Sequence, residues 1–596
     1  MASPRYSIGL DFGTESVRAL LLDLHSGREV SAVARYRHGV IEHQLPTGGT
    51  PLPADYALQD PGDYLESMGL ASREVLRQAK VRPEAVVGIG VSATSCTMLP
   101  VDAEGKPLCF RKELERDPHA WVKLWKHHGA TAEAEELTRI ARNRKERFLR
   151  LTGGGISPEW MFPKMLETLR RSHKVYAAAV LFVEAGDWIV GRLTGRFPGK
   201  LTRSACQAGY KAGWSQELGY PSADFLAAVD RRFRMVAVEQ LRGDVRPVGT
   251  SAGELAPEAA RTLGLRPGIA VGVAMIDAHA AALGAGLSRA GQFVLVMGTS
   301  TCHMTVAPRE VSIPGVSGVV RDGILPGTYG YEAGQSAVGD LLGWLVRVLG
   351  AGPDADAAHR ALAERAAASP AGANGLLALD WWNGNRSVLM NPRLTGLIAG
   401  LTLRTRPEDL YRALVESTAF GTRRILEAFE KAGLRIRELR AGGGLPERNP
   451  LLLQAYADVL GREIVRVRSA QASALGAALL GSVAAGKKGK GYDSLPEAIE
   501  KLVRAEDAPV TPRSGQTAVY DRLYRLWNRL HDHFGNEQPG LMSELREFRH
   551  PDPPPTLTTL EPSKPEVRGK RQHAGRHPAE ASGPKVGART RKRSKG

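Results

Sequence analysis

The chain has 596 residues, a formal net charge of +17, 43% hydrophobic residues and 24% charged residues. This composition is typical of a soluble globular protein with room for two or three domains, which excludes a small binding module. No apolar run approaches the roughly 18 residues of a membrane-spanning helix, so we expect no membrane partner. The first apolar strand follows the N-terminus almost at once, and we therefore expect a cytoplasmic protein without a signal peptide.

Cysteine and histidine are spaced too widely for a disulfide framework or a zinc site. The four cysteines lack Cys-x-x-Cys spacing, which favours a reducing compartment. They are Cys96, Cys109, Cys206 and Cys302. Four histidines show no metal-ligand pattern, and we interpret them as structural. They are His127, His128, His279 and His303.

Residues 8–23, I-G-L-D-F-G-T-E-S-V-R-A-L-L-L-D, predict a strand, an acidic glycine-containing turn and a second strand. Gly13 lets the backbone approach a nucleotide phosphate, and Thr14 and Ser16 add hydroxyl and N–H donors. Asp11, at the end of the first strand, can reach Mg²⁺ through water. An ordinary β-hairpin can have the same short motif, so this stretch alone does not distinguish a purely structural turn from an ATP-binding turn.

The rest of the chain mixes strand and helix patterns, which predicts an α/β fold. Strands are expected at residues 8–10, 17–23, 86–91, 269–273 and 293–297, and helices at 61–78, 160–171, 407–432 and 449–460. Residues 351–375, rich in alanine and charge, predict a surface helix without a catalytic role.

Domain organisation follows from a run of turn-forming residues at 247–265, which precedes a new apolar strand. We therefore expect an N-terminal domain of residues 1–255 and a C-terminal domain of residues 256–545. A proline-rich stretch from Asp552 leads into a basic tail, and we expect residues 546–596 to be disordered.

The first hairpin has a second copy. Residues 292–307, Q-F-V-L-V-M-G-T-S-T-C-H-M-T-V-A, repeat its design, with Gly298, Thr299 and Ser300 in the turn. Two half-chains that each present a Gly-Thr hairpin indicate a duplicated domain with a nucleotide bound between the copies.

Asp277, in V-G-V-A-M-I-D-A-H-A-A, follows an apolar strand and precedes small residues that begin a helix. A carboxylate at this point can accept the proton of an attacking hydroxyl group. It can equally serve as the N-cap of the helix. The residues alone leave both roles open.

Taken together, the motifs resemble those of the FGGY carbohydrate kinases. The similar motifs are D-F-G-T-E-S, G-T-S-T, G-G-G-L-P-E-R-N and residues 396–416, and the resemblance covers residues from about 6 to 530. Within the family, six further segments are similar to L-ribulokinases: residues 124–128, 157–164, 208–214, 298–304, 331–340 and 379–386.

This resemblance implies two actin-like (ribonuclease H-like) α/β domains with the active site in the cleft between them. It implies ATP- and Mg²⁺-dependent phosphorylation of a ketopentose, namely L-ribulose to L-ribulose 5-phosphate in L-arabinose catabolism. The sugar would bind mostly to the first domain and ATP mostly to the second. Neither the fold nor the phosphate-binding hairpins select the sugar, so D-ribulose, xylulose and ribitol are alternative substrates.

Several site residues follow from the same resemblance. It implies that Asp277 is the catalytic base and that Lys211 and Glu332 hydrogen-bond the ketopentose, with Ser95 as a further contact. Polyol recognition needs such groups because an unpaired buried hydroxyl costs about 1–3 kcal/mol. For Lys211 the alternative is a surface lysine whose stem lies on the ring of Tyr210.

Gly443, Gly444 and Asn449 are expected on the adenine side of the site. A backbone without Cβ admits a flat base, and the Asn amide can bond to the purine or the ribose. The alternative is a strand-to-helix turn with glycine at positive φ, and both interpretations can hold together.

One position departs from the resemblance. Many ribulokinases carry Asp where this chain has Ser92. If that Asp only stabilises the cleft, Ser can replace it as a hydrogen-bonding group. If it helps hold the sugar or the metal, this enzyme would be slower or would prefer another polyol.

The segment 563–596 holds eleven Lys or Arg residues and two Glu residues, so it supplies nine of the 17 net positive charges. It either makes a weak electrostatic contact with nucleic acid or serves as a solubilising extension. A nucleic-acid-associated regulator is the alternative from another functional class, but the tail lacks interleaved aromatic residues. The sequence leaves open whether the chain forms a homodimer.

Overall fold

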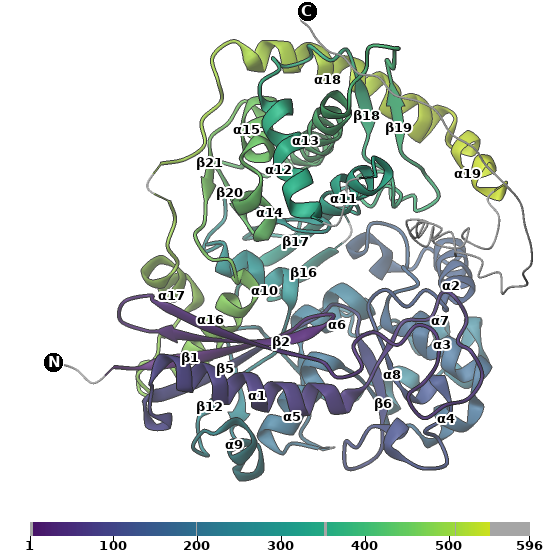
Figure 1. Cartoon of the computed structure of the whole chain (residues 1–596). Helices are drawn as coiled ribbons and strands as arrows, with labels where there is room; N and C mark the ends of the chain where they lie inside the picture. Colours follow the sequence, from purple (N-terminus) through teal and green to yellow (C-terminus); the bar gives the residue numbers. More distant parts are fainter. Residues whose placement is uncertain (1–3, 198, 317, 351–353, 507, 549–596) are drawn as a thin grey trace, which may run out of the picture. The chain divides into compact units, whose positions relative to one another are not determined.

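The computed structural model describes residues 4–197, 199–316, 318–350, 354–506 and 508–548 (Figure 1). One compact unit extends to Arg546. The predicted disordered tail, residues 546–596, therefore lies almost entirely outside the described residues. Within them, no helix is long and apolar enough to cross a membrane.

The first sheet combines an antiparallel meander with parallel strands. Its order is β11-β12-β5-β1-β2-β3, and β13 also pairs with β5. The strands are β1 (Tyr6–Phe12), β2 (Ser16–Asp23), β3 (Glu29–Arg35), β5 (Val86–Ala93), β11 (Ser251–Glu254), β12 (Ala270–Gly272) and β13 (Met275–Ile276). Strands β1, β2 and β3 are antiparallel neighbours, whereas β5 is parallel to both β1 and β12. Because β1 and β5 are covered on both faces, they read as continuous apolar runs.

The second sheet repeats this topology. Its order is β16-β17-β15-β14-β20-β21, in which β17, β15 and β14 are antiparallel and β20 and β21 are parallel to β14. The strands are β14 (Gln292–Met297), β15 (Thr301–Ala307), β16 (Gly318–Arg321), β17 (Tyr329–Gln335), β20 (Glu438–Gly442) and β21 (Ile464–Arg466). The repeated order confirms the duplication that the two hairpins predicted.

Helices cover both faces of the first sheet (Figure 1). On one face α1 (Pro61–Ala79) packs on β2 and β3, and on the other α16 (Ala472–Ala485) packs on β1 and β5. Glycine is required at this second contact, because a Cβ on Gly9 or Gly90 would lie 1.9 or 1.8 Å from a carbonyl oxygen of α16. α16 also packs against α10 (Asp277–Gly284). The two sheets are therefore joined through a seam of small residues.

The remaining elements surround these sheets. In the N-terminal half they are β4 (Leu58–Gln59), β6 (Met98–Val101), β7 (Val122–Lys123), β8 (Leu181–Glu184), β9 (Thr202–Ser204), β10 (Asp244–Arg246), α2 (Thr131–Asn143), α3 (Met161–Arg171), α4 (His173–Ala178), α5 (Ala185–Thr194), α6 (Ala205–Ala212), α7 (Ala223–Val229), α8 (Val236–Glu239) and α9 (Pro257–Leu263). In the C-terminal half they are α11 (Gly339–Val348), α12 (Ala355–Ala367), α13 (Pro407–Lys431), α14 (Gly444–Arg448), α15 (Pro450–Leu460), α17 (Leu495–Leu502), α18 (Gln516–Asp532), α19 (Pro539–Glu547), β18 (Leu377–Leu379) and β19 (Leu397–Ala399).

The predicted boundary between residues 255 and 256 falls inside the first sheet. β12, expected to open the second half, pairs in parallel with β5. Parallel pairing needs a long crossover, so a strand remote in sequence can complete a sheet. The second sheet begins only with β14, after α10.

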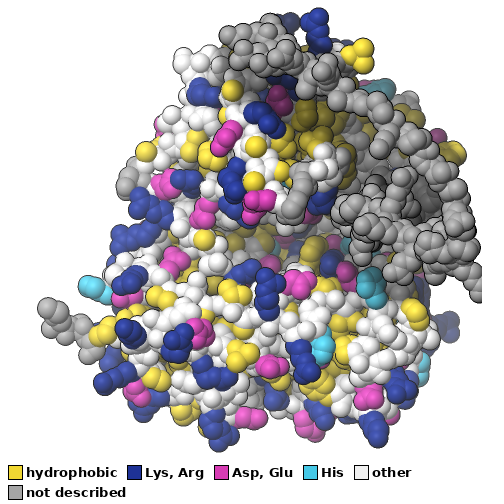
Figure 2. Space-filling model, in the orientation of Figure 1, with side chains coloured by type: hydrophobic (Ala, Val, Ile, Leu, Met, Phe, Trp, Pro, Cys, Tyr) yellow, Lys and Arg dark blue, Asp and Glu magenta, His cyan; other side chains and the backbone are white. Residues whose placement is uncertain are grey.

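Charge is mixed on the face of the molecule drawn in Figure 2. On the face drawn in Figure 2, Lys and Arg side chains are interspersed with Asp and Glu. The net charge of +17 is therefore not gathered into one basic surface among the described residues of this face.

Candidate active site

The first hairpin turn is anchored by contacts from other segments. The N–H of Gly13 donates to the carbonyl of Ser16 at 3.0 Å, which closes the turn. The indole N–H of Trp125 donates to the Thr14 hydroxyl at 3.1 Å. Gln59 donates to the Thr14 carbonyl at 2.7 Å. These three bonds fix the conformation of the turn.

The second hairpin turn has a similar but shorter form. The N–H of Gly298 donates to the carbonyl of Ser300 at 2.9 Å, and the pairing resumes at Thr301. The Thr299 carbonyl accepts from the N–H of Val338 at 3.0 Å, while the residue itself is exposed. The second loop thus has one residue fewer than the first. Each loop carries Gly-Thr at the corresponding end of its own sheet.

Asp11, one residue before the end of β1, carries a buried carboxylate. It accepts a hydrogen bond from Ser92 at 2.9 Å, and Arg18 lies 3.4 Å from its other oxygen. Burial raises the pKa of Asp11, and the Arg18 charge offsets this only in part. Ser92 therefore acts as a neutral hydrogen-bond donor, and at 3.5 Å it also reaches the carbonyl of Ser473 on α16.

Asp277 is the first residue of α10, one position after the N-cap Ile276. Its carboxylate accepts from the N–H of Ala278 at 2.7 Å. Burial, together with the nearby charge of Asp11, raises the pKa of Asp277 to about 7. The N-cap role considered for Asp277 is therefore wrong, because Ile276 occupies that position. The raised pKa is the property that a general base needs, and the role as a base stays a prediction.

Lys211, on α6, is buried rather than solvated, with only 4% of its surface exposed. Its ammonium lies 3.0 Å from Oε2 of Glu332 on β17. Burial alone would lower the pKa of Lys211, but the Glu332 carboxylate keeps it above its ordinary value. The structure therefore brings together the two residues expected to bind the sugar, from opposite halves of the chain.

Ser95 lies in a turn that Lys164 stabilises through hydrogen bonds to the backbone. The Lys164 ammonium donates to the carbonyls of Cys96 and Leu124, each at 2.8 Å. Burial lowers the pKa of Lys164 to about 8. One buried cation thus ties the turn of Ser95 to the segment that carries Trp125, the hydrogen-bond donor to the first hairpin.

On the expected adenine side, Gly443 has φ of +104°, and a Cβ there would lie 2.4 Å from the Met297 carbonyl oxygen. Asn449 is buried and engaged within the protein. It donates to the hydroxyl of Tyr411 at 3.0 Å and caps α15 by accepting from the N–H of Leu452. Contact of Gly443, Gly444 and Asn449 with adenine stays a prediction.

Sequence reasoning missed one ion-pair partner and one close neighbour of Glu332. Arg386 forms an ion pair with Oε1 of Glu332, and His279 lies 3.6 Å from Oε2. His279 had been interpreted as structural, although it lies two residues after Asp277. The motif L-D-W-W-N-G-N-R ends on Arg386, but no periodic pattern indicates which way a loop arginine points.

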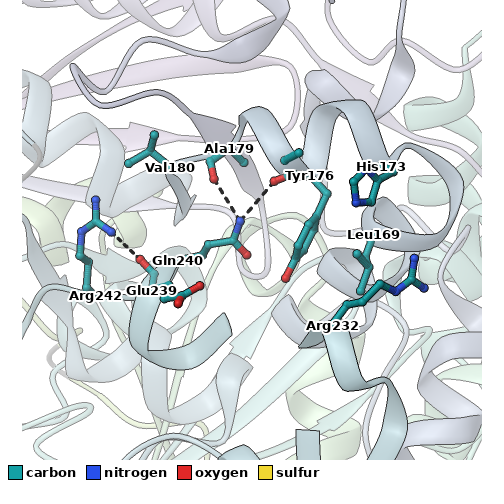
Figure 3. Close-up of a pocket in the computed structure, with 10 residues that line it drawn as sticks. Leu169, His173, Tyr176, Ala179, Val180, Arg232, Glu239, Gln240 and Arg242 are labelled. Carbon is teal, nitrogen blue, oxygen red and sulfur yellow. Dashed lines mark hydrogen bonds between the residues drawn. The ribbon is translucent and has the colours of Figure 1, made fainter. Parts of the chain in front are cut away.

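Two further clusters lie outside this site. In the pocket of Figure 3, Gln240 donates to the carbonyls of Tyr176 and Ala179, and Arg242 donates to that of Glu239. None of the predicted site residues lines it. These bonds fasten the segment after α8 to the end of α4.

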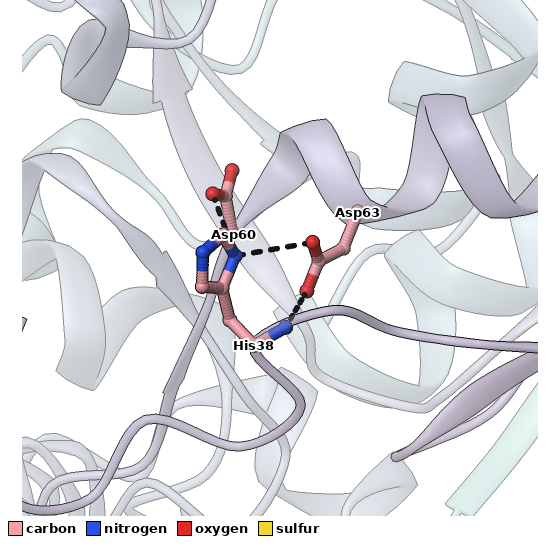
Figure 4. Close-up of side chains that lie close together, drawn as sticks. All are labelled: His38, Asp60 and Asp63. Carbon is pink, nitrogen blue, oxygen red and sulfur yellow. Dashed lines mark hydrogen bonds and ion pairs between the residues drawn. The ribbon is translucent and has the colours of Figure 1, made fainter. Parts of the chain in front are cut away.

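In Figure 4, Nδ1 of His38 lies 3.2 Å from Asp60 and 3.1 Å from Asp63. Asp60 is also the N-cap of α1 and accepts from the N–H of Gly62 at 2.7 Å. The cluster therefore joins the loop of His38 to the start of α1. Its carboxylate oxygens already accept hydrogen bonds within the protein.

Comparison with known proteins assigns the chain to a family. Residues 6–284 match the N-terminal domain and residues 293–485 the C-terminal domain of the FGGY family of carbohydrate kinases. The chain belongs to this family. It is therefore a carbohydrate kinase, and kinase chemistry implies ATP as the phosphoryl donor. The two family domains meet between β13 and β14, where the sheets also change.

The chain is similar to curated ribulokinases over nearly all of its length. Ribulokinase from Geobacillus thermodenitrificans is 47% identical over 552 residues, which cover 91% of this chain and 97% of that protein. Ribulokinase from Mycolicibacterium smegmatis is 42% identical over 558 residues, with 92% and 97% covered.

Solved structures confirm the two-domain α/β fold. Ligand-bound xylulose kinase from Lactobacillus acidophilus has a TM-score of 0.73 at 18% identity, covering 90% of this chain and 100% of that one. Glycerol kinase from Plasmodium falciparum with ADP has a TM-score of 0.70 at 16% identity, covering 89% and 98%.

The turn before α14 provides a test of the adenine side. Gly443→Ala should raise the KM for ATP about tenfold or more, because its Cβ would meet the Met297 carbonyl and displace the turn from the second hairpin. Initial rates at varied ATP measure this. The matched control is Gly433→Ala, also at positive φ but with no atom within 4 Å of the new Cβ. A wild-type KM for ATP in the Gly443 variant would remove this turn from the nucleotide site.

Proposed function

We propose that the protein transfers the γ-phosphoryl group of ATP to a ketopentose, and that its substrate is L-ribulose, which becomes L-ribulose 5-phosphate. The observation that carries the proposal is the placement of Asp277, a carboxylate whose pKa is raised to about 7, near enough to the buried Lys211–Glu332 pair for both of their charges to act on that pKa. The similarity to ribulokinases over 91% of the chain supports a ketopentose as the acceptor.

Asp277 is the proposed catalytic base. An alcohol is far less acidic than a carboxylic acid, so its proton moves late, as negative charge leaves the attacking oxygen. The base then orients the nucleophile, and most of the acceleration comes from alignment and charge stabilisation. A pKa raised to about 7 suits this role, since the group is a stronger base than an ordinary Asp, half ionised near neutral pH and mostly ionised above it.

Lys211, Glu332 and Ser95 are proposed to bind the sugar hydroxyls. Each hydroxyl both donates and accepts, so it is satisfied only by a donor and an acceptor together. The ammonium of Lys211 can only donate, and the ionised carboxylate of Glu332 can only accept. The pair 3.0 Å apart therefore offers both functions on the proposed sugar side.

The two hairpins are proposed to hold the ATP phosphates through Gly13, Thr14 and Ser16 on one side and Gly298, Thr299 and Ser300 on the other. The donor set also suits Mg²⁺, a hard cation that prefers oxygen ligands and keeps several waters. Asp11, whose charge contributes to the raised pKa of Asp277, would hold it through water. When bound, Mg²⁺ would neutralise charge on the phosphates.

A second candidate acceptor is another pentulose or a pentitol, such as D-ribulose, xylulose or ribitol. Ser92 favours this alternative, because many ribulokinases carry Asp at the matching position. The hydrogen bond from Ser92 to Asp11 keeps a polar contact there without a second carboxylate.

A panel of sugars tests the substrate. With ADP formation as the readout, L-ribulose should give the highest kcat/KM, followed by other ketopentoses, with pentitols and aldopentoses far behind. A preference for xylulose or ribitol would replace the proposed substrate but keep the kinase. Turnover of none of them would overturn the proposed function.

Asp277→Asn should retain ATP binding but lose phosphoryl transfer by several orders of magnitude, because the amide cannot accept the proton. ATP binding by calorimetry and ADP formation by a coupled assay separate the two effects. Asp322→Asn, on a surface turn, is the matched control. Turnover near that of the wild type would contradict the base assignment.

The raised pKa of Asp277 predicts a pH dependence. Because the base must be ionised, kcat/KM for the sugar should fall as the pH is lowered through about 7 and level off above it. The residual activity of Asp277→Asn should lack this step. A wild-type profile that stays flat between about pH 6 and 8 would show that another group accepts the proton.

A further inference from the structure

Glu332 is enclosed by nitrogen-bearing groups from three elements. Lys211 on α6 lies 3.0 Å from Oε2, His279 on α10 lies 3.6 Å from the same oxygen, and Arg386, in the loop after β18, pairs with Oε1. The Lys211 and His279 contacts connect the first-sheet side of the chain to β17, but Arg386 approaches from the second half. Its role is not explained by the sugar contacts proposed above.

We propose that Arg386 is a positioning residue that determines sugar affinity, by holding the Glu332 carboxylate in the orientation that accepts a hydrogen bond from the ketopentose. This inference rests on the proposed function. A carboxylate has about four lone-pair directions. With Lys211 on one oxygen and Arg386 on the other, the carboxylate cannot rotate, so the direction from which it accepts a sugar hydroxyl is fixed.

The loop of Arg386 is built to hold the guanidinium in place. Ser387 accepts from the N–H of Gly334 on β17 at 3.2 Å, and the backbones of Asn385 and Asn391 exchange two bonds of 2.9 Å. Gly334 shares its face of β17 with Glu332, because side chains alternate along a strand. A Cβ on Gly334 would lie 3.2 Å from Cδ and Nη1 of Arg386. The arginine thus occupies the space that this glycine leaves open.

Charge gives Arg386 a second effect on the same carboxylate. Burial would raise the pKa of Glu332, but the Lys211 and Arg386 cations outweigh it and hold that pKa well below its usual range. Burial lowers the pKa of His279 to about 3, so this third group is neutral. Glu332 therefore stays an acceptor at every working pH. Without Arg386, Lys211 alone would oppose the burial, and the pKa of Glu332 would rise.

Steady-state kinetics with L-ribulose test the role. Arg386→Met should raise the KM for L-ribulose about tenfold and leave the KM for ATP within about twofold. Arg386→Lys should recover part of the loss, because it restores the charge without the planar fork. Gly334→Ala should have a smaller effect in the same direction. The matched control is Arg393→Met, an exposed arginine of the same loop, which should behave as the wild type.

A pH series separates this role from a merely structural one. In Arg386→Met the KM for L-ribulose should rise as the pH is lowered, because Glu332 becomes protonated and stops accepting. The rise should exceed any change in the wild-type KM over the same pH range, to which Asp277 also contributes. An unchanged KM in Arg386→Met, or equal losses for sugar and ATP, overturns the inference while leaving the proposed function intact. A wild-type enzyme that phosphorylates no ketopentose overturns both.

Discussion

The close approach of α16 to the first sheet is the constraint on which the site depends. The helix comes so near β1 and β5 that a Cβ on Gly9, Gly88 or Gly90 would lie 1.8–2.0 Å from its carbonyl oxygens. α10 packs on the same helix just as closely, through Gly284 and Gly476. Since Asp11 lies near the end of β1 and Asp277 begins α10, this seam sets how the two carboxylates lie relative to each other. Larger residues at these glycines would push α16 away from β1, β5 and α10, and so would displace Asp11 and Asp277 without any change to the site residues themselves.

That placement has an electrostatic consequence. Asp11 and Asp277 each lose hydration, and the charge of Asp11 adds to the rise in the pKa of Asp277. In the Lys211–Glu332 pair burial has a different outcome, because the charge of each partner keeps the other ionised. One site therefore contains a carboxylate with raised basicity and another that stays charged. Proton transfer and sugar recognition need these two different behaviours.

Much of the fold could be predicted from local pattern. The apolar strands around D-F-G-T and M-G-T-S-T gave both hairpins, and helical spacing gave α1 and α13 nearly to their ends. The domain boundary could not be predicted in this way, because β12 joins β5 across more than a hundred residues and no local signal encodes that pairing. The burial of Lys211 was hidden for the same reason, since its partner Glu332 lies 121 residues away.

The site residues also fall into those that local sequence can predict and those that depend on contacts remote in sequence. Asp11 lies near the end of a strand and Asp277 begins a helix, and such positions can be read from the sequence. Arg386 lies in a loop 54 residues from Glu332, where only the tertiary structure selects a partner. Asn449 shows that one motif can carry two interpretations. Its amide donates to Tyr411 and caps α15, so the motif marks a helix start, while the expected bond to the purine or the ribose stays a prediction.

Ser92 shows how one substitution alters the charge of such a site. Its hydroxyl lies 2.9 Å from Asp11, so the Asp common in ribulokinases would place a second carboxylate at nearly the same distance. Two carboxylates that close cannot both ionise freely, and one pKa rises strongly. A neutral donor at residue 92 instead favours the ionised form of Asp11, the form that a cation would bind. The substitution therefore changes the group beside Asp11 and the ionisation of Asp11 itself, while Asp277, Lys211 and Glu332 stay in place.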